Sequence, residues 1–67
     1  MNADRVEVSW DAQKNKWLIR IHVGEEVIRR YCGERKNVDQ EKLRVAAEKT
    51  ARDEGYEVAQ GSISVLP

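Results

Sequence analysis

The sequence predicts an α+β fold with the element order β-β-β-α-β: a three-stranded antiparallel meander plus a C-terminal strand, with one helix packed on one face of the sheet. Two observations predict this fold. Apolar and polar residues alternate through the first half of the chain, which is the period of a half-buried strand. Residues 43–51 instead repeat their apolar members at helical spacing. A length of 67 residues leaves room for one core, so we expect residues 1–67 to form a single small domain.

The first two strands are expected to form a hairpin. Apolar residues occupy every second position of both segments: Val6, Val8 and Trp10 in the first, and Trp17, Ile19, Ile21 and Val23 in the second. The polar residues 11–16 between them are typical of a turn. Pairing Trp10 with Trp17 places both apolar sets on one face of the sheet, so this is the register we expect.

A third strand is predicted over residues 26–32, after a two-residue turn of the II′ type that begins at Gly24. In this register Ile28 and Cys32 join the apolar face. Arg30 also points toward that face. An edge of the sheet tolerates such an arginine, because its stem lies flat on the apolar surface while its guanidinium reaches water.

The helix is expected to follow the polar residues 33–36. Its apolar stripe consists of Leu43, Ala46, Ala47, Thr50 and Ala51. Two start signals overlap, because Asn37 with Gln40 fits a capping box whereas Asp39 fits an N-cap. Gly55 fits the end of the helix, since glycine favours the left-handed conformation that closes many helices.

The tail is predicted to contain the last strand, over residues 56–58 and 62–66, with an interruption near Gly61. Because the helix returns the chain to the starting edge of the meander, this strand should run parallel to the first. A right-handed crossover then places it beside the first strand.

Composition excludes several classes of function. Lys and Arg together number 12, as do Asp and Glu, so the formal net charge is zero, which argues against coating nucleic acid or anchoring to a membrane by bulk charge. One Cys and one His are too few for a disulfide or a tetrahedral zinc site, so we expect no metal and no cofactor. No apolar stretch approaches the roughly 20 residues of a membrane span. The N-terminus lacks a signal-peptide pattern, and we therefore expect a cytoplasmic protein with no membrane partner.

Catalytic residues are not expected. His22 and Cys32 are the conventional base and nucleophile candidates, but the predicted register places them on opposite faces of the sheet. The four glycines are isolated, so no glycine-rich phosphate loop is present. The sequence therefore predicts a binding module that is not an enzyme.

The predicted registers leave one face of the sheet without a covering helix. This face gathers Arg5, Glu7, Leu18, Arg20, His22, Val27, Arg29 and Tyr31. Arginines beside an aromatic residue on an open sheet suit nucleic acid, since they contact phosphates and base edges. The candidate nucleic-acid-binding residues are Arg5, Arg20, Arg29, Tyr31, Arg35 and Lys36.

Two other interpretations of this face stay open. An apolar patch for a protein partner, or for a second copy of the chain in a homodimer, is formed by Leu18, Val27 and Tyr31. A homodimer could also form by pairing of exposed edge strands from two copies of the chain. Alternatively, Glu7 lies between Arg20 and Arg29 and only neutralises them. Exposed pairs of that kind contribute about 0–1 kcal/mol, which neither requires nor excludes a function.

The first hairpin also carries a family resemblance. Residues 8–11 read Val-Ser-Trp-Asp, residues 15–17 read Asn-Lys-Trp, and apolar residues follow at alternate positions. This pattern resembles the opening hairpin of AP2-type DNA-binding domains and is similar to that of the arm-type N-terminal domains of phage integrases. Those families present a three-stranded sheet to the DNA major groove with one helix behind it. The resemblance covers roughly residues 6–55 and implies a duplex DNA partner. The zero net charge disfavours strong nonspecific binding, so we expect DNA to be bound weakly or site-selectively. The resemblance implies that the residues facing the DNA are Arg5, Glu7, Arg20 and Arg29.

Overall fold

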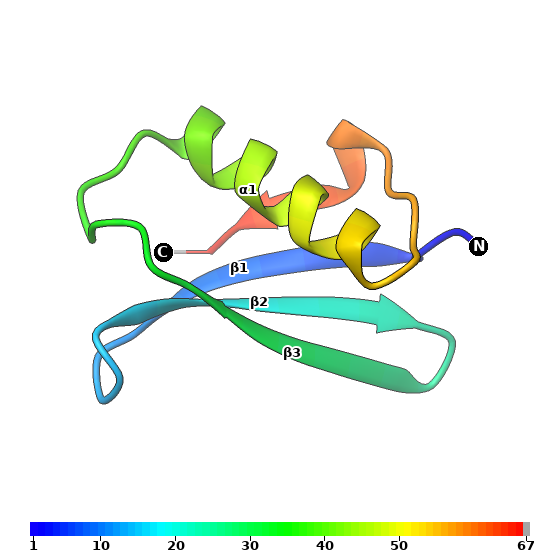
Figure 1. The fold of residues 1–67 in the computed structure, drawn as a ribbon, viewed down its shortest axis with the longest axis horizontal. Coiled ribbons are helices and arrows are strands. Elements are labelled where there is room, and N and C mark those ends of the chain that lie inside the picture. Colours follow the sequence, from blue (N-terminus) through cyan, green and yellow to red (C-terminus); the bar gives the residue numbers. More distant parts are fainter. Residues whose placement is uncertain (67) are drawn as a thin grey trace.

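The computed structural model describes residues 1–66 and confirms the predicted α+β class, with one helix lying across one face of a four-stranded sheet (Figure 1). The elements are β1 (Arg5–Asp11), β2 (Lys16–Val23), β3 (Glu26–Cys32), α1 (Gln40–Asp53), the 3₁₀ turn η1 (Gln60–Ser62) and β4 (Ile63–Val65). β1, β2 and β3 form the antiparallel meander, and β4 pairs with β1 in parallel. The strand order is therefore β3-β2-β1-β4, as the sequence predicted.

The predicted strand registers are confirmed. Trp10 lies opposite Trp17 in the β1–β2 pair, and Ile28 lies opposite Ile21 in the β2–β3 pair. Both pairings keep the apolar side chains on the side of the sheet that α1 covers. Gly24 has a φ of +60° in the two-residue turn between β2 and β3, which agrees with the turn expected there.

The core lies between α1 and the sheet. Its buried residues are Val6, Val8, Trp17, Ile19, Ile21, Leu43, Ala47, Ala51 and Ile63. The sheet supplies the large side chains, whereas two of the three buried helix residues are alanines. Small residues on the helix allow its backbone to approach the sheet closely, and pairing small with large residues favours dense packing.

Both ends of α1 have defined caps. Asp39 is the N-cap residue, in agreement with the second of the two predicted start signals, although its side chain makes no capping hydrogen bond. At the other end Gly55 has a φ of +91°. The N–H of Tyr56 donates to the carbonyl of Ala51, and the N–H of Gly55 donates to the carbonyl of Arg52, both at 2.9 Å. These two bonds form a Schellman motif, which stops the helix.

The prediction for the last strand is wrong in its extent. Residues 56–58 form only an isolated bridge, in which Glu57 pairs with Asn2 just ahead of β1, and β4 itself spans three residues. The interruption near Gly61 is the 3₁₀ turn η1. Tyr56 and Val58 pack against the core from outside the strand, so burial rather than strand pairing explains their apolar character.

Arg30 lies at the edge of the sheet, where the sequence placed it. β3 is an edge strand, and α1 packs mainly over β4, β1 and β2. The Arg30 guanidinium therefore reaches past the sheet edge to the end of the helix, where Nη2 contacts Glu54 Oε1 at 2.6 Å. A partly exposed ion pair thus bridges β3 and the residue that follows the helix.

Candidate nucleic-acid interface

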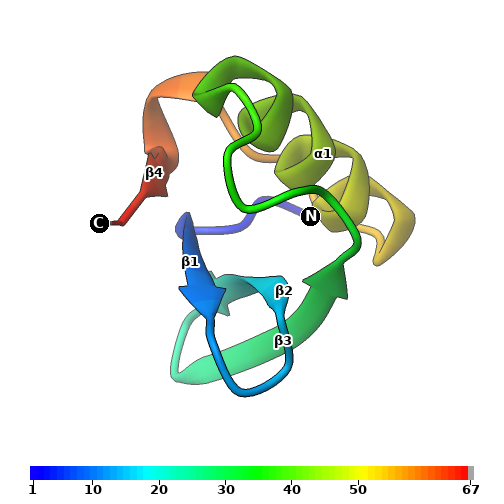
Figure 2. The ribbon, with the colours of Figure 1, turned by 90° about the vertical axis from the view of Figure 1, so that its left-hand side faces the viewer.

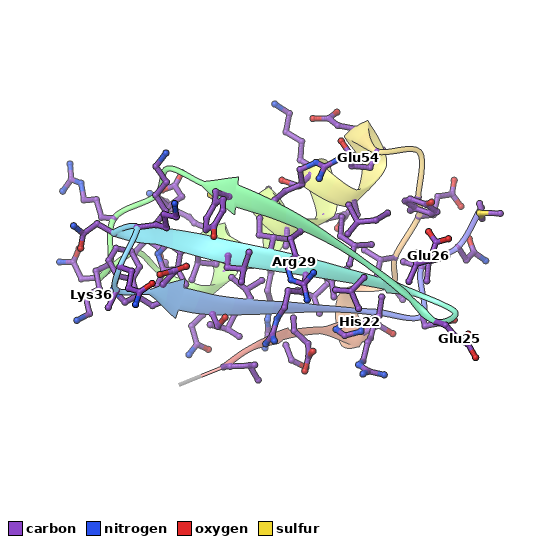
Figure 3. The ribbon with its side chains drawn as sticks, turned by 90° about the horizontal axis from the view of Figure 1, so that it is seen from below. His22, Glu25, Glu26, Arg29, Lys36 and Glu54 are labelled. Atoms are coloured by element: carbon purple, nitrogen blue, oxygen red, sulfur yellow. The ribbon has the colours of Figure 1, made fainter. Side chains whose placement is uncertain are left out.

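The face of β1–β3 opposite α1 is uncovered by other described elements. Figure 2 shows α1 and the segment leading to β4 on one side of the meander, and Figure 3 looks onto the other side, which we call the open face. The strand registers arrange its side chains in three cross-strand rows. The rows are Arg5, His22 and Val27; Glu7, Arg20 and Arg29; and Ser9, Leu18 and Tyr31.

The middle row holds two arginines that face each other across neighbouring strands. Arg20 on β2 is directly opposite Arg29 on β3. Like charges in directly opposite positions destabilise a sheet. Arg29 lies across the face toward the middle of the sheet (Figure 3), and it makes no ion pair with any described residue. Its charge is therefore not compensated within residues 1–66.

Glu7, the acidic member of the middle row, is held by a histidine. His22 Nε2 lies 2.7 Å from Glu7 Oε1, whereas Arg20 Nη2 lies 4.0 Å from the same oxygen. Arg20 Nε is buried and has no hydrogen-bond partner among the described residues. An unpaired buried donor of this kind costs about 1–3 kcal/mol. Glu7 therefore contacts mainly His22, and the contact between Glu7 and Arg20 is long and weak.

Tyr31 is positioned at the end of the third row by Asp11. Its hydroxyl donates to Asp11 Oδ2 at 3.3 Å, while Asp11 Oδ1 accepts the backbone N–H groups of the β1–β2 turn, from Gln13 and Lys14. Partial desolvation and the Asp11 carboxylate raise the pKa of the Tyr31 phenol above its ordinary value, and Arg29 opposes part of that rise. Tyr31 as a whole is 47% exposed, so an aromatic side chain is available on the open face.

The last two candidate residues lie elsewhere. Arg35 and Lys36 belong to the loop between β3 and α1, and this loop docks on the tryptophans of the core side. The indole Nε1 of Trp17 donates to the carbonyl of Arg35 at 2.7 Å, and Lys36 Nζ is 5.9 Å from the centroid of the Trp10 ring. The open face therefore brings together four of the six candidates, and the other two flank one end of the sheet on its helix side.

The apolar candidates of the open face do not form one continuous patch. Leu18 lies directly opposite Tyr31, but Val27 lies in the first row, opposite His22. The row that contains Arg20 and Arg29 separates them. An apolar partner surface would thus have two small parts with charge between them.

Sequence reasoning did not find two contacts that organise this face. His22 contacts Glu7 diagonally, since its directly opposite neighbour on β1 is Arg5. Tyr31 on β3 reaches Asp11 on β1 across the one intervening strand, β2. Diagonal neighbours in a sheet lie about 7–8 Å apart, within reach of a long side chain. The strand register could therefore have indicated the contact between His22 and Glu7. The contact between Tyr31 and Asp11 also depends on the side-chain conformation of Tyr31.

Other kinds of site have little support in residues 1–66. Cys32 lies on the helix side of the sheet and His22 on the open face, so the two do not form a nucleophile–base pair. The described residues contain no cluster of three His, Cys, Asp or Glu side chains that could hold a metal ion. Within the same part of the chain, α1 is too short and too polar to cross a membrane.

Comparison of the chain with protein-family models, with curated proteins and with solved structures gave no match in any of the three.

Proposed function

We propose that the protein is a small binding module without enzymatic activity, and that it binds duplex DNA through the open face, weakly or site-selectively. The observation that carries the proposal is the pair of facing arginines in the middle row, Arg20 and Arg29, on a face with no covering element among the described residues. Guanidinium groups contact phosphates, and they read guanine edges through two parallel hydrogen bonds. Tyr31 adds an exposed ring beside them.

The distribution of charge along the strands supports a particular orientation on DNA. The end with the β2–β3 turn carries acidic residues, and the opposite end carries basic ones. Figure 3 shows Glu25 and Glu26 at one end of the sheet and Lys36 at the other. The acidic set is Asp4, Glu25, Glu26 and Glu57, beside Arg5. The basic set is Lys14 and Lys16, beside Asp11 and Glu34, together with Arg35 and Lys36 on the helix side of the same end. A polyanion is therefore expected to lie over the middle row and extend toward the basic end.

The second candidate is a protein-interaction or self-assembly module. It is favoured by the outer edge of β3, a seven-residue strand with no described neighbour on that side. Against it stands Arg30, whose inward-pointing charge at this edge is a common way to prevent pairing between sheets. The interrupted apolar surface of Leu18, Tyr31 and Val27 also offers a small area to a protein partner.

A titration with a short DNA duplex of mixed sequence at low salt tests the proposal. Amide and arginine side-chain resonances of β1–β3 should shift, while those of the exposed side of α1 should not. Raising the salt from about 50 to 200 mM should weaken binding steeply, with the slope of log K against log salt near −0.9 for each neutralised phosphate. Analytical ultracentrifugation of the same sample measures self-association.

Substitution separates the two candidates further. Arg29→Gln should weaken DNA binding and reduce the salt slope by about 0.9, since one phosphate contact is lost. Arg44→Gln, an equivalent change at an exposed helix position, is the matched control and should leave binding unchanged. Absence of shifts on β1–β3 would contradict DNA binding, and a mass that rises with concentration would favour self-assembly.

A further inference from the structure

We propose that Arg20 and Arg29 together form a phosphate subsite at the centre of the open face, and that its natural occupant is a phosphodiester group of the nucleic-acid backbone. This inference rests on the proposed function, because it assigns one particular contact of that interface. Its starting point is the direct opposition of the two arginines on β2 and β3. Directly opposite residues in antiparallel strands have Cβ atoms only about 4.5–5.5 Å apart, so both side chains can converge on one small group.

The protein's own carboxylate does not fill this subsite. Glu7 is the acidic group of the same row, yet its Oε1 lies 2.7 Å from His22 Nε2 and 4.0 Å from Arg20 Nη2. The longer distance lies outside the range of a charge-assisted hydrogen bond, which is about 2.7–2.9 Å. Glu7 thus makes its short contact with His22 and only a long ion pair with Arg20, so both guanidinium groups retain unused donors.

The present conformation of Arg20 also favours recruitment of an anion. The side chain is 31% exposed, but its Nε is buried without a hydrogen-bond partner in the described part of the chain. A side-chain rotation that brings the guanidinium toward an incoming anion would give Nε–H a hydrogen-bond acceptor. The rotation would break the contact with Glu7, but this contact is long, so little is lost. Binding would thus relieve an unfavourable state of the free protein in addition to forming new contacts.

A phosphodiester suits the arrangement because of its shape and charge. Its two non-bridging oxygens each have more than one lone pair, so each guanidinium can donate two parallel N–H bonds to the group, one guanidinium from each strand. Arginine is the side chain best matched to such two-point recognition of phosphate, and lysine delivers the same charge without the fork. A conservative substitution therefore distinguishes a built subsite from simple charge attraction.

The test follows the Nε–H resonances of Arg20 and Arg29 in two titrations, one with inorganic phosphate and one with duplex DNA, each at constant ionic strength against chloride. Both ligands should shift both resonances saturably. Arg20→Lys and Arg29→Lys should each weaken phosphate binding about tenfold, as expected when a charge-assisted hydrogen bond is lost. Arg44→Lys on α1 is the control and should leave it unchanged. The amide spectrum of each variant verifies that the sheet is intact.

The outcomes distinguish this inference from the proposed function. Saturable phosphate binding without DNA binding supports an anion site at Arg20 and Arg29, but it overturns both the DNA module and the nucleic-acid occupant proposed for that site. DNA binding that leaves the two Nε–H resonances unmoved and is unaffected by the lysine variants overturns the subsite while the proposed function stands. Phosphate shifts that do not saturate, or that persist undiminished in both lysine variants, also overturn the subsite.

Discussion

At the level of single residues, the charge of the open face depends on what Glu7 contacts. Its carboxylate neutralises part of the positive charge from Arg20, and it holds His22 at hydrogen-bond distance. One acidic side chain thus sets both the net charge of the middle row and the position of the histidine. The alternative in which Glu7 only neutralises Arg20 and Arg29 is weakened, because Arg29 makes no ion pair within residues 1–66.

Glu7→Gln is therefore expected to strengthen DNA binding. The amide keeps an oxygen that accepts from His22, while the loss of one negative charge near the arginines is worth about 1 kcal/mol in water, or roughly fivefold in affinity. Fluorescence anisotropy of a labelled duplex at low salt measures the change. Glu41→Gln, at an exposed position in the first turn of α1, is the control. Equal affinity of the wild type and Glu7→Gln would show that this face does not contact the duplex.

Tyr31 makes a second residue-level prediction, which concerns pH. The pKa of Tyr31 is raised in the fold, so the folded state favours the neutral phenol. The stability that this preference contributes is fully present below the ordinary tyrosine pKa. It is lost as the pH rises through the raised pKa. Asp11→Asn removes the carboxylate charge and should lower the Tyr31 midpoint, while the Asn oxygen still accepts from the turn N–H groups. Ultraviolet titration of the phenolate in a Tyr56→Phe background measures this midpoint.

The matched control for that titration is Asp4→Asn. Asp4 accepts the Gly24 N–H at the opposite end of the sheet, so its charge is distant from Tyr31. An Asp11→Asn midpoint equal to that of the wild type would contradict the hydrogen bond between Tyr31 and Asp11.

At the level of elements, the end of α1 depends on one backbone conformation. Gly55 has a φ of +91°, and a Cβ built there meets no atom within 4 Å, so substitution is strained by conformation and not by collision. Gly55→Ala should lower the free energy of unfolding by about 1–2 kcal/mol. Gly33→Ala is the comparison, because that glycine has open space and no positive φ. Urea denaturation measures both, and equal midpoints would argue against the Schellman cap.

The elements also show how far periodicity predicts this structure. The registers of β1, β2 and β3 were predictable because a shift by one residue would expose Val6, Ile19 and Ile28 to water. The extent of β4 was not, since residues 56–58 are apolar at alternate positions yet pack on the core beside the N-terminal segment. Alternation of apolar and polar residues indicates which side chains are buried. It does not indicate whether the backbone pairs with another strand.

The candidate interface was predictable to the same degree. The register alone placed Arg5, Arg20, Arg29 and Tyr31 on one face. The loop that carries Arg35 and Lys36 has no periodicity, and its position depends on one indole hydrogen bond and one cation–ring contact. Contacts of that kind follow from three-dimensional packing and have no signature in a short polar segment.

At the level of the whole molecule, stability rests on a small core. A domain of this length has roughly 3–10 kcal/mol of stability, from about 0.05–0.15 kcal/mol per residue. Leu43 is 1% exposed and is the largest buried side chain that α1 contributes. Leu43→Ala should therefore lower the free energy of unfolding by about 2–5 kcal/mol, which is much of the stability of the domain.

Val45→Ala on the same helix is the control for that measurement. Val45 is 59% exposed, and surface substitutions of this kind usually change stability by less than about 0.5 kcal/mol. Urea denaturation of the two variants should give clearly different midpoints. A small loss in Leu43→Ala would mean that α1 is not packed on the sheet as described.

The parallel pairing of β1 with β4 has a consequence for how the chain folds during synthesis. Val6 lies beside Ile63, so β1 acquires its second neighbour only after residue 63 has left the ribosome. The β1–β2–β3 meander has local contacts and can form early, but contacts between such distant residues require a long loop to close and form slowly. Until then the β1 edge remains available to other nascent chains, and the interval before β4 docks is when aggregation is most probable.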